Sequence, residues 1–497
     1  MMSHPPLFLI DPEAMSRVDD AAGRSGIPLF SLMERAGQAV AACALRHYPQ
    51  ALRFVVLCGS GNNGGDGYVA ARALSQSGAA VVVHHFGDVE NLKGDARTAF
   101  ERSGATPTPL AAYLPQVGDV VIDAVFGAGL SRDVPSELKR VIEAVAAARV
   151  PVIAVDLPSG LCGRRGVPLG AAFAAQQTVT FMARKPGHLL LPGRELCGEL
   201  EVFDIGIPQR IVSAHAGHVA ENHPLMWQDV LPRPEAETHK FRRGHLTVFS
   251  GPAHASGAAR MTSLAALKAG AGIVTVAAPR SALDVLSATL TAVMSTRLDD
   301  DDNLRLWLED KRHGAFVLGP GFGDFEKARG FVSLLGDRSL VLDADGITAF
   351  RESPESLFTL IRSGHGQSVL TPHEGEFARL FPDIAIDSAL GKIERAQAAS
   401  ARSGAVIVYK GADTVIAAPD GRALVNTNAP PFLATAGSGD VLAGIVGALL
   451  AQGASAFEAA AAGVWLHGEA GERAGSGLTA EDLVHAVRPF GVAPRVY

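Results

Sequence analysis

Short apolar runs alternate along the chain with stretches of helical apolar spacing, and this alternation predicts strands followed by helices. In the first half, strands are predicted at 54–58, 80–83, 120–126 and from 152, with helices within 13–47 (broken at 23–28) and at 68–76 and 136–148. In the second half, strands are predicted at 245–250, 273–277, 315–318, 340–342, 369–370 and 406–409, with helices before 269 and at 440–450 and 456–474. Strands that alternate with helices favour layered α/β domains with mostly parallel sheets.

Chain length and a proline-containing stretch indicate the domain organisation. The chain has 497 residues, more than a single hydrophobic core usually serves, so two domains are expected. Residues 207–238 contain four prolines and little apolar periodicity. We therefore expect a first domain at 1–215, a linker at 216–238 and a second domain at 239–497.

Charge and composition narrow the class of protein. The net charge of −7, without a basic stripe that has interleaved aromatic residues, argues against a nucleic-acid partner. No window reaches the roughly 18 uninterrupted apolar residues of a membrane span, and the N-terminus lacks the pattern of a signal peptide. The four cysteines (43, 58, 162 and 197) lack Cys-x-x-Cys spacing, which is typical of buried thiols in a reducing compartment and not of a structural zinc site. We therefore expect a cytoplasmic protein with no membrane contact.

A glycine-rich loop, Gly59–Gly67, follows the first predicted strand and precedes a helix. The spacing Gly59-x-Gly61-x-x-Gly64 formally matches the dinucleotide-binding fingerprint. An NAD-dependent dehydrogenase also needs an acid about 20 residues further on, at the end of the second strand. That strand ends in His84-His85-Phe86 and the next acids come later, so this function is disfavoured. The loop also offers more polar side chains than a phosphate cradle needs, which could coordinate a cation or hold ribose and phosphate oxygens: Asn62, Asn63 and Asp66.

Two further strand ends carry carboxylates. Asp123 lies in the predicted strand 120–126, and Asp156 ends the strand that starts at 152. In a parallel sheet, such residues gather at the edge where the first glycine loop lies, and ligands bind at this edge. One acid at a strand end is usually a loop cap, but two of them together with the asparagine-containing loop favour a site.

These segments resemble the signature motifs of the NAD(P)H-hydrate epimerases. The matching motifs are Leu32-Met-Glu-Arg-Ala-Gly37, Gly61-Asn-Asn-Gly-Gly-Asp-Gly67, Asp123-Ala-Val-Phe-Gly-Ala-Gly129 and Asp156-Leu-Pro-Ser-Gly160. The resemblance covers about residues 10–210, and it implies a Rossmann-like domain that acts on the C6 carbinolamine of damaged nicotinamide cofactors, with Asp156 as the acid–base residue. It implies contacts with the hydrated cofactor from Asn62, Asn63, Gly64, Gly65, Asp66, Gly127, Ala128, Gly129, Leu130, Ser131, Arg132, Asp133 and Asp156. It also implies a potassium ion, whose hard oxygen ligands would come from Asn63, Asp123 and Ser159.

In the second half, the glycines on either side of Ser438 indicate a candidate catalytic site. Gly437 and Gly439 precede a long apolar helix, so bare backbone N–H groups and the helix dipole can converge on an anion there. The carboxylate of Asp440 would repel that anion, so it needs another role there. Such a role is to take the proton of a hydroxyl that attacks a bound phosphate. The alternative is that Asp440 only caps the helix. The chain has no Walker A motif and no protein-kinase motif set, so a nucleotide would have to bind at this anion hole.

Other strand ends of the second half carry polar residues at the same predicted edge. His373 follows Thr371-Pro372, and Lys410 ends a strand. Both residues could bind a ligand. The alternatives are that His373 is a capped loop histidine and that Lys410 is a surface lysine. Asp343 and Asp345 have no clear role from their spacing, and both a strand-end turn and metal–water ligation stay open.

Together with Gly319-Pro-Gly321 and Lys410-Gly411, these residues make the second half resemble the ribokinase-like superfamily, and within it the ADP/ATP-dependent NAD(P)H-hydrate dehydratases. The resemblance covers about residues 240–490. It implies magnesium bound with ADP, and ADP contacts from Lys410, Gly411, Ala412, Asp413, Thr414 and Gly439. It implies contacts with the hydrate from Ala258, Gly321, His373 and Asp440, with Asp440 as the base.

The two resemblances together imply an α/β protein in which a Rossmann-like epimerase domain precedes a ribokinase-like, layered dehydratase domain. Such a protein would repair NADHX and NADPHX with ADP as the donor, and we expect it to form a homo-oligomer. Phosphorylation would turn the C6 hydroxyl, a poor leaving group, into a good one, and the epimerase would recycle the epimer that the dehydratase rejects. A small-molecule kinase with an N-terminal binding module and a protein with a non-catalytic first half are the alternatives.

Overall fold

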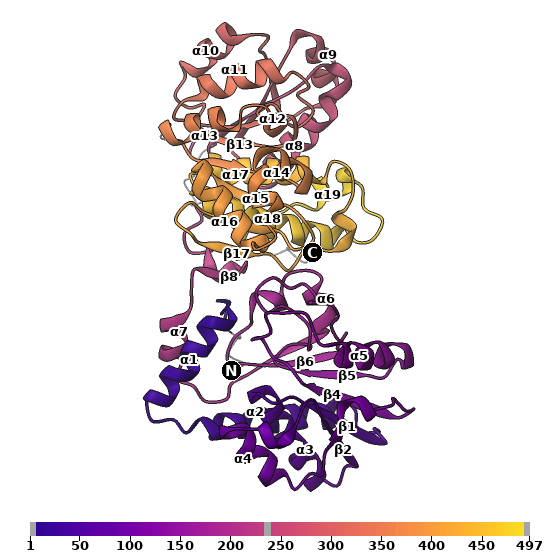
Figure 1. Cartoon of the computed structure of the whole chain (residues 1–497). Coiled ribbons are helices and arrows are strands. Elements are labelled where there is room, and N and C mark those ends of the chain that lie inside the picture. The colour runs from indigo at the N-terminus through magenta and orange to yellow at the C-terminus, as the bar shows by residue number, and fades with distance from the viewer. Residues whose placement is uncertain (1–5, 233–239, 365, 492–497) are drawn as a thin grey trace. The chain divides into compact units, whose positions relative to one another are not determined.

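The computed structural model describes residues 6–232, 240–364 and 366–491. The chain divides into two compact units, with the boundary between Val219 and Ala220 (Figure 1). Within the described ranges, no helix is long and apolar enough to cross a membrane.

The second unit begins earlier than the sequence suggests. Strand β8 (Val219–Glu221) is an edge strand of the second unit's sheet, beside β17 (Ala423–Val425). The backbone N–H of Asn222 donates to the carbonyl oxygen of Val425 at 2.8 Å. The expected linker at 216–238 is therefore not a plain connection, because it contains a strand whose pairing partner lies about 200 residues further along the chain, which local periodicity does not reveal. Residues 233–238 of that linker lie outside the described residues.

A seven-stranded parallel sheet forms the centre of the first unit, in the order β3-β2-β1-β4-β5-β6-β7. Its strands are β1 (Arg53–Cys58), β2 (Val81–His85), β3 (Thr108–Pro109), β4 (Asp119–Ala124), β5 (Val152–Val155), β6 (Gln177–Phe181) and β7 (Glu199–Phe203). From β1 the chain adds β2 and β3 on one side and then returns to pair β4 on the other. Open parallel sheets bind ligands at the carboxyl ends of their strands, beside such a reversal.

Helices cover both faces of this sheet because its central strands are apolar on both sides. Alternate residues of β1 point to opposite faces, so Val56 enters the core that includes Val40 of α2, and Val55 enters the core that includes Leu138 of α5. The helices of the unit are α1 (Pro12–Arg24), α2 (Leu29–His47), α3 (Asn62–Gln76), α4 (Gly94–Ser103), α5 (Ser136–Ala148), α6 (Gly193–Cys197) and α7 (Gln209–His215). The structure confirms the expected Rossmann-like, doubly wound arrangement.

The second unit is built on a ten-stranded sheet in the order β11-β10-β9-β12-β13-β14-β15-β16-β17-β8. The strands from β11 to β15 are parallel, and β15, β16 and β17 pair antiparallel. Besides β8 and β17, the strands are β9 (His245–Phe249), β10 (Ile273–Ala278), β11 (Met294–Arg297), β12 (Ala315–Leu318), β13 (Ser339–Leu342), β14 (Ser368–Leu370), β15 (Val406–Tyr409) and β16 (Val415–Ala417). A layered α/β unit is therefore confirmed here as well.

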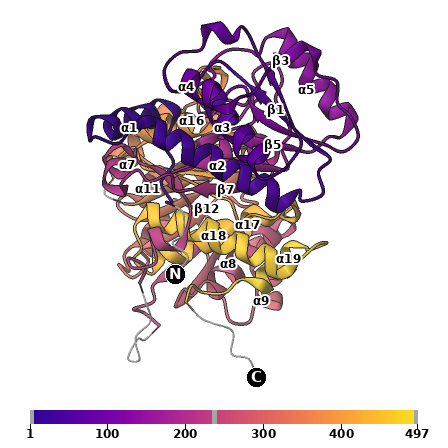
Figure 2. The ribbon, with the colours of Figure 1, turned by 90° about the horizontal axis from the view of Figure 1, so that it is seen from below.

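One helix of the second unit is almost entirely apolar: α17 (Ser438–Ala451) packs against α8 (Ser256–Lys268), α18 (Ala456–Ala474) and the strands β12 and β13 (Figures 1 and 2). A Cβ atom on Gly444 would lie 2.1 Å from the carbonyl oxygen of Thr262, so only glycine allows this approach of α17 to α8. The other helices are α8 (Ser256–Lys268), α9 (Arg280–Thr289), α10 (Asp301–Leu308), α11 (Phe325–Leu335), α12 (Ala344–Thr348), α13 (Pro354–Ser363), α14 (Glu374–Leu380), α15 (Pro382–Ile386), α16 (Lys392–Ser403), α18 (Ala456–Ala474) and α19 (Ala480–Ala486).

Candidate active sites

The first unit contains a cavity of about 760 Å³ at the carboxyl ends of its strands. Helices α1 and α2, the loop that begins α3 and the segment 125–132 line it. Of the residues expected to contact a ligand, those that line the cavity are Asn62, Asn63, Asp66, Gly127, Ala128, Gly129, Leu130, Ser131, Arg132 and Asp156. Gly64, Gly65 and Asp133 are not among its lining residues. A Cβ atom on Gly64 would lie 1.8 Å from the carbonyl oxygen of Gly59, so this glycine serves the tight start of α3.

Asp156 lies directly after β5 and has a positive φ of 66°, a conformation that side-chain-bearing residues rarely adopt. Its Oδ1 accepts hydrogen bonds from Thr180 Oγ1 at 3.0 Å and from Lys185 Nζ. Its Oδ2 accepts from the backbone N–H of Ala128 at 3.1 Å. Burial alone would raise the pKa of Asp156, but the charge and hydrogen bond of Lys185, together with His188 and the N–H of Ala128, outweigh the effect of burial and hold that pKa below its ordinary value. Asp156 is therefore an ionised carboxylate in the cavity wall.

Lys185, which the sequence analysis missed, is the direct partner of Asp156. It is fully buried and lines the cavity, and its Nζ also donates to Thr180 Oγ1 at 2.9 Å. The neighbouring His188 accepts the backbone N–H of Lys185 on Nδ1 at 2.9 Å, so its Nε2–H donates to the carbonyl oxygen of Asp156 at 2.8 Å. Burial lowers the pKa of His188 to about 4, so the ring is neutral. Its two hydrogen bonds fix the backbone of Lys185 relative to that of Asp156.

Three more carboxyl groups line the cavity, those of Asp19, Asp66 and Asp95. Burial, together with the negative charge of Asp156, raises the pKa of Asp66 well above its ordinary value. Burial also raises the pKa of Asp19 to about 6, while the charge of Lys185 opposes the rise. Asp19 lies on α1 and was not expected from the sequence. The cavity thus combines an ionised carboxylate with a carboxyl group whose pKa is raised, the two kinds of group that acid–base catalysis uses.

Asp123 and Ser159 form a buried oxygen cluster behind the cavity. Asp123 Oδ1 accepts from Ser159 Oγ at 2.5 Å, and Asp123 Oδ2 accepts from the backbone N–H of Ser159 at 2.6 Å. Ser159 Oγ also lies 3.1 Å from the carbonyl oxygen of Phe126. Burial raises the pKa of Asp123 to about 6. These hard oxygen atoms are of the kind that an alkali cation prefers.

Asn63 faces the same region from the first turn of α3. A Cβ atom on Gly127 would lie 3.0 Å from Asn63 Oδ1, so the amide lies against the segment that follows Asp123. The Nδ2 atom of Asn63 is buried and has no hydrogen-bond partner. Unpaired buried amides are rare, and a ligand atom at this place would satisfy it. Asn63 thus lies against the segment 125–127, and Ser159 Oγ accepts the backbone N–H of Phe126 in that segment at 2.8 Å.

In the second unit, Asp440 lies in the first turn of α17, whose N-cap is Gly437 with a φ of 85°. Burial and the negative charge of Asp343 raise the pKa of Asp440 to about 7, while the charge of Lys410 opposes the rise. The buried His467 fixes the side chain of Ser438, because Ser438 Oγ lies 3.1 Å from His467 Nε2. A carboxylate whose pKa lies near neutrality is suited to take a proton from a hydroxyl.

Asp343, whose role was open from the sequence, binds Lys410. Lys410 Nζ donates to Asp343 Oδ1 at 2.7 Å, and Thr371 Oγ1 donates to the same oxygen at 2.7 Å. Burial alone would lower the pKa of Lys410, but the negative charges of Asp343 and Glu376 outweigh the effect of burial and raise this pKa. A Cβ atom on Gly439 would lie 3.5 Å from Lys410 Nζ. The ammonium group therefore stands beside the glycine-built start of α17, where an anion would bind.

Gly321 and Ala258, both expected to contact the hydrate, are neighbours in the structure. A Cβ atom on Gly321, where φ is 60°, would lie 3.1 Å from that of Ala258. Asp345 fixes the same loop, because its Oδ2 accepts the backbone N–H of Gly323 at 3.0 Å. Asp345 is a loop anchor in this arrangement, and its charge adds to the raised pKa of Asp440.

His373 begins α14 as its N-cap, and its Nδ1 accepts the backbone N–H of Gly375 at 3.0 Å. Its Nε2 lies 3.4 Å from Oε1 of Glu376, whose other oxygen lies 3.9 Å from Lys410 Nζ. The side chain of His373 is about half exposed, so it is open to a ligand. The expected ADP segment, Lys410–Thr414, forms a turn in which the N–H of Gly411 donates to Thr414 Oγ1 at 3.1 Å.

Known proteins match both parts of the chain. Residues 29–187 match the family model of the YjeF-related protein N-terminus, and residues 246–487 match that of NAD(P)H-hydrate dehydratase. The bifunctional NAD(P)H-hydrate repair enzyme of Moorella thermoacetica is 36% identical over 494 residues, which cover 94% of this chain and 92% of that protein. The corresponding enzyme of Escherichia coli is 32% identical and covers 93% of this chain and 90% of its own length. The solved structure of the ADP/ATP-dependent NAD(P)H-hydrate dehydratase from Bacillus subtilis is 27% identical, with a TM-score of 0.45 over 52% of this chain and 91% of that chain.

Proposed function

The chain belongs to the family of bifunctional NAD(P)H-hydrate repair enzymes, and we propose that each of its two units performs one of the two repair reactions. The first unit interconverts the R and S epimers of NADHX and NADPHX, in which water has added at C6 of the nicotinamide ring. The second unit dehydrates the S epimer and converts ADP to AMP and phosphate. One observation supports this division most: each unit places a partly buried aspartate near a lysine that follows a parallel strand, Asp156 with Lys185 and Asp440 near Lys410.

Epimerisation requires the C6 hydroxyl to leave and water to return on the other face of the ring. The protonated carboxyl of Asp66 is the proposed acid, which gives its proton to the departing hydroxyl so that water leaves. The lone pair of the ring nitrogen stabilises the resulting cation. Asp156 then takes a proton from the water that adds to the opposite face, and Lys185 keeps this carboxylate ionised between turnovers.

We propose that Asn63, Asp123 and Ser159 hold a potassium ion in the first unit. The oxygen cluster of Asp123 and Ser159 supports this assignment, and the amide oxygen of Asn63 lies against the segment that follows Asp123. The ion would supply positive charge next to a phosphate-bearing substrate and would fix the segment that starts at Gly127.

Dehydration by the second unit begins when Asp440 takes the proton of the C6 hydroxyl. The hydroxyl oxygen attacks the β-phosphate of ADP, a C–O–P bond forms, and the bond to AMP breaks. The backbone N–H groups at Gly437–Gly439 and the ammonium group of Lys410 stabilise the charge on the transferred phosphoryl group. Phosphate then leaves C6 with the electron pair of the C–O bond, the ring nitrogen supplies electrons, and loss of a proton from C5 restores the double bond.

Magnesium would accompany ADP in this unit. The acids beside Asp440, Asp343 and Asp345, would face it, and the ion would neutralise phosphate charge. Besides stabilising the phosphoryl group, Lys410 forms an ion pair with Asp343. This ion pair reduces the repulsion that the carboxylates of Asp343 and Asp440 would exert on the nucleotide.

The experiment that tests the proposal gives the purified protein acid-hydrated NADH, as mixed epimers, with ADP, ATP or neither. We expect the absorbance of reduced nicotinamide to recover fully with ADP and not without a donor, and Asp156→Asn to limit recovery to the S fraction. Recovery without a nucleotide would contradict the role of Asp440. A stable phosphorylated product instead of NADH would mean that the second unit is a small-molecule kinase.

We also propose a cytoplasmic location and a homo-oligomeric state. All four cysteines are free thiols, as a reducing compartment would keep them. Sedimentation of the purified chain would test the oligomeric state, and a monomer at all concentrations would contradict it.

A further inference from the structure

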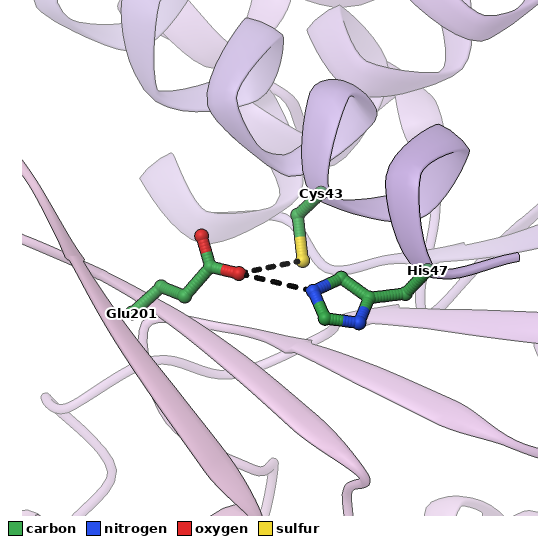
Figure 3. A group of neighbouring side chains, drawn as sticks. All are labelled: Cys43, His47 and Glu201. Carbon is green, nitrogen blue, oxygen red and sulfur yellow. Dashed lines mark hydrogen bonds and ion pairs between the residues drawn. The ribbon is translucent and has the colours of Figure 1, made fainter.

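A cysteine, a histidine and a glutamate meet at the edge of the first unit's sheet, where neither proposed reaction uses them. Cys43 and His47 lie one turn apart on α2, and Glu201 lies on β7, the edge strand. Figure 3 shows the sulfur atom and the imidazole ring turned toward the same carboxylate oxygen. Glu201 Oε1 lies 3.2 Å from His47 Nε2 and 3.8 Å from Cys43 Sγ.

These separations match those between neighbouring ligands of a tetrahedral zinc ion. Zinc binds nitrogen and oxygen at about 2.0 Å and sulfur at about 2.3 Å, so its tetrahedral ligands lie about 3.3–3.6 Å apart. The three candidate ligand atoms all lie within 4.8 Å of one another. Small rotations of these side chains would bring the three atoms onto one ion, because both helical ligands are presented from adjacent turns of the same face.

The cluster is buried on one side and open on the other. Cys43 is 1% exposed, whereas the side chains of His47 and Glu201 are 24% and 29% exposed. An ion can therefore enter past the imidazole and the carboxylate and complete its coordination with water. Arg46 at present donates to Glu201, but its side chain is 57% exposed and can turn to solvent.

We propose that Cys43, His47 and Glu201 bind a zinc ion. A thiolate, an imidazole and a carboxylate favour zinc or a similar transition metal over magnesium, calcium or potassium. The thiol proton of Cys43 passes to solvent as the metal–sulfur bond forms, so the thiolate and the carboxylate balance the two charges of the ion. The cysteine spacing argued against a structural zinc site, because two of the three ligands are not cysteines and one of these two, Glu201, lies on a distant strand.

Zinc at this position would fasten the last turn of α2 to β7. The first turns of the same helix supply Leu29, Leu32, Met33 and Ala36 to the wall of the cavity. Metal binding would therefore hold the helix that forms this wall, and we expect it to raise the unfolding temperature of the first unit.

The test uses the full chain, with cobalt(II) as a spectroscopic probe and zinc(II) as the competitor. We expect one equivalent of cobalt to produce the near-ultraviolet absorption of a thiolate–cobalt bond, and zinc to displace it. Cys43→Ser and His47→Gln should remove this absorption, whereas Cys162→Ser, at another free and partly exposed cysteine, should keep it. Arg46→Gln should tighten binding, because it frees the carboxylate of Glu201.

Two results would overturn the proposal: no thiolate–cobalt absorption in the native chain, or an absorption that Cys43→Ser retains. Glu201→Gln guards against a folding artefact, since it keeps the size of the side chain and its exposed position. Its circular dichroism should match that of the native chain while its affinity for zinc falls at least tenfold. Unchanged affinity in that variant would also contradict the site.

Discussion

Asp440→Asn is the change that most directly separates the two reactions. The variant keeps the shape of the side chain but cannot take a proton from the C6 hydroxyl. Loss of a general base usually costs about 10²–10⁴-fold in rate, or about 3–5 kcal/mol of barrier. We therefore expect dehydration of S-NADHX with ADP to fall by at least about 100-fold. Epimerisation should stay at the native rate, because its groups belong to the first unit.

The assay follows the two reactions separately. Chromatographic separation of the R and S epimers without a nucleotide measures epimerisation, and the recovery of NADH absorbance with ADP measures dehydration. For the native chain, the dehydration rate should rise as the pH passes about 7, where Asp440 loses its proton, and the variant should lack this rise. Loss of both activities, or a variant with more than about a tenth of the native dehydration rate, would refute the assigned role.

The same variant should be more stable than the native chain above neutral pH. The pKa of Asp440 is raised from 3.8 to about 7, so the folded state opposes its ionisation. This cost is absent below pH 3.8, grows as the pH rises and is complete above about pH 7, where it amounts to at most about 4 kcal/mol. We expect Asp440→Asn to raise the thermal unfolding midpoint of the second unit at pH 8 and to change it little at pH 4. The transition of the second unit is identified as the one that added ADP shifts. A lower midpoint at pH 8 would contradict the pKa assigned to Asp440.

Three further changes test other parts of the structure. Lys185→Met removes the charge that keeps Asp156 ionised, so epimerisation at pH 7 should fall at least about 100-fold while dehydration of S-NADHX is unchanged; an unaffected epimerase would exclude the pair. Asp123→Asn should abolish any acceleration of epimerisation by potassium over sodium, and a variant that still responds to potassium would place the ion elsewhere. Gly444→Ala should destabilise the second unit by about 1–3 kcal/mol in urea unfolding, because its Cβ would lie 2.1 Å from the carbonyl oxygen of Thr262, and an unchanged midpoint would show that α8 and α17 can separate.

Strand ends were predictable from the sequence because apolar runs followed by glycines and acids are local signals. Asp123 and Asp156 were singled out in this way, and Asp440 by the glycines that precede its helix; burial opposes the ionisation of all three, so none is a fully solvated surface acid. The α/β class followed from the same alternation of elements. The sequence did not reveal where each side chain would point, which depends on how the elements pack.

Lys185 and Asp19 show why part of the first site could not be predicted. Lys185 follows β6, whose run Gln177–Phe181 mixes threonines with apolar residues and was not identified as a strand. Asp19 lies on an amphipathic helix among other charged residues, and only the packing of α1 directs it into the cavity. Similarly, Asp343 and Lys410 are 67 residues apart, and only the order β13-β14-β15 brings their strand ends together.

The two sites use a lysine in opposite ways, and the difference matches the two reactions. Lys185 binds the reactive carboxylate itself and lowers the pKa of Asp156. A weak base suffices there, because water that adds to a cation loses its proton readily, and a permanent negative charge stabilises that cation. Lys410 binds a different aspartate, Asp343, and so leaves Asp440 with a raised pKa. In the proposed mechanism, a hydroxyl that attacks a phosphate gives up its proton less readily and needs this stronger base, so each lysine lies where the proposed reaction requires it.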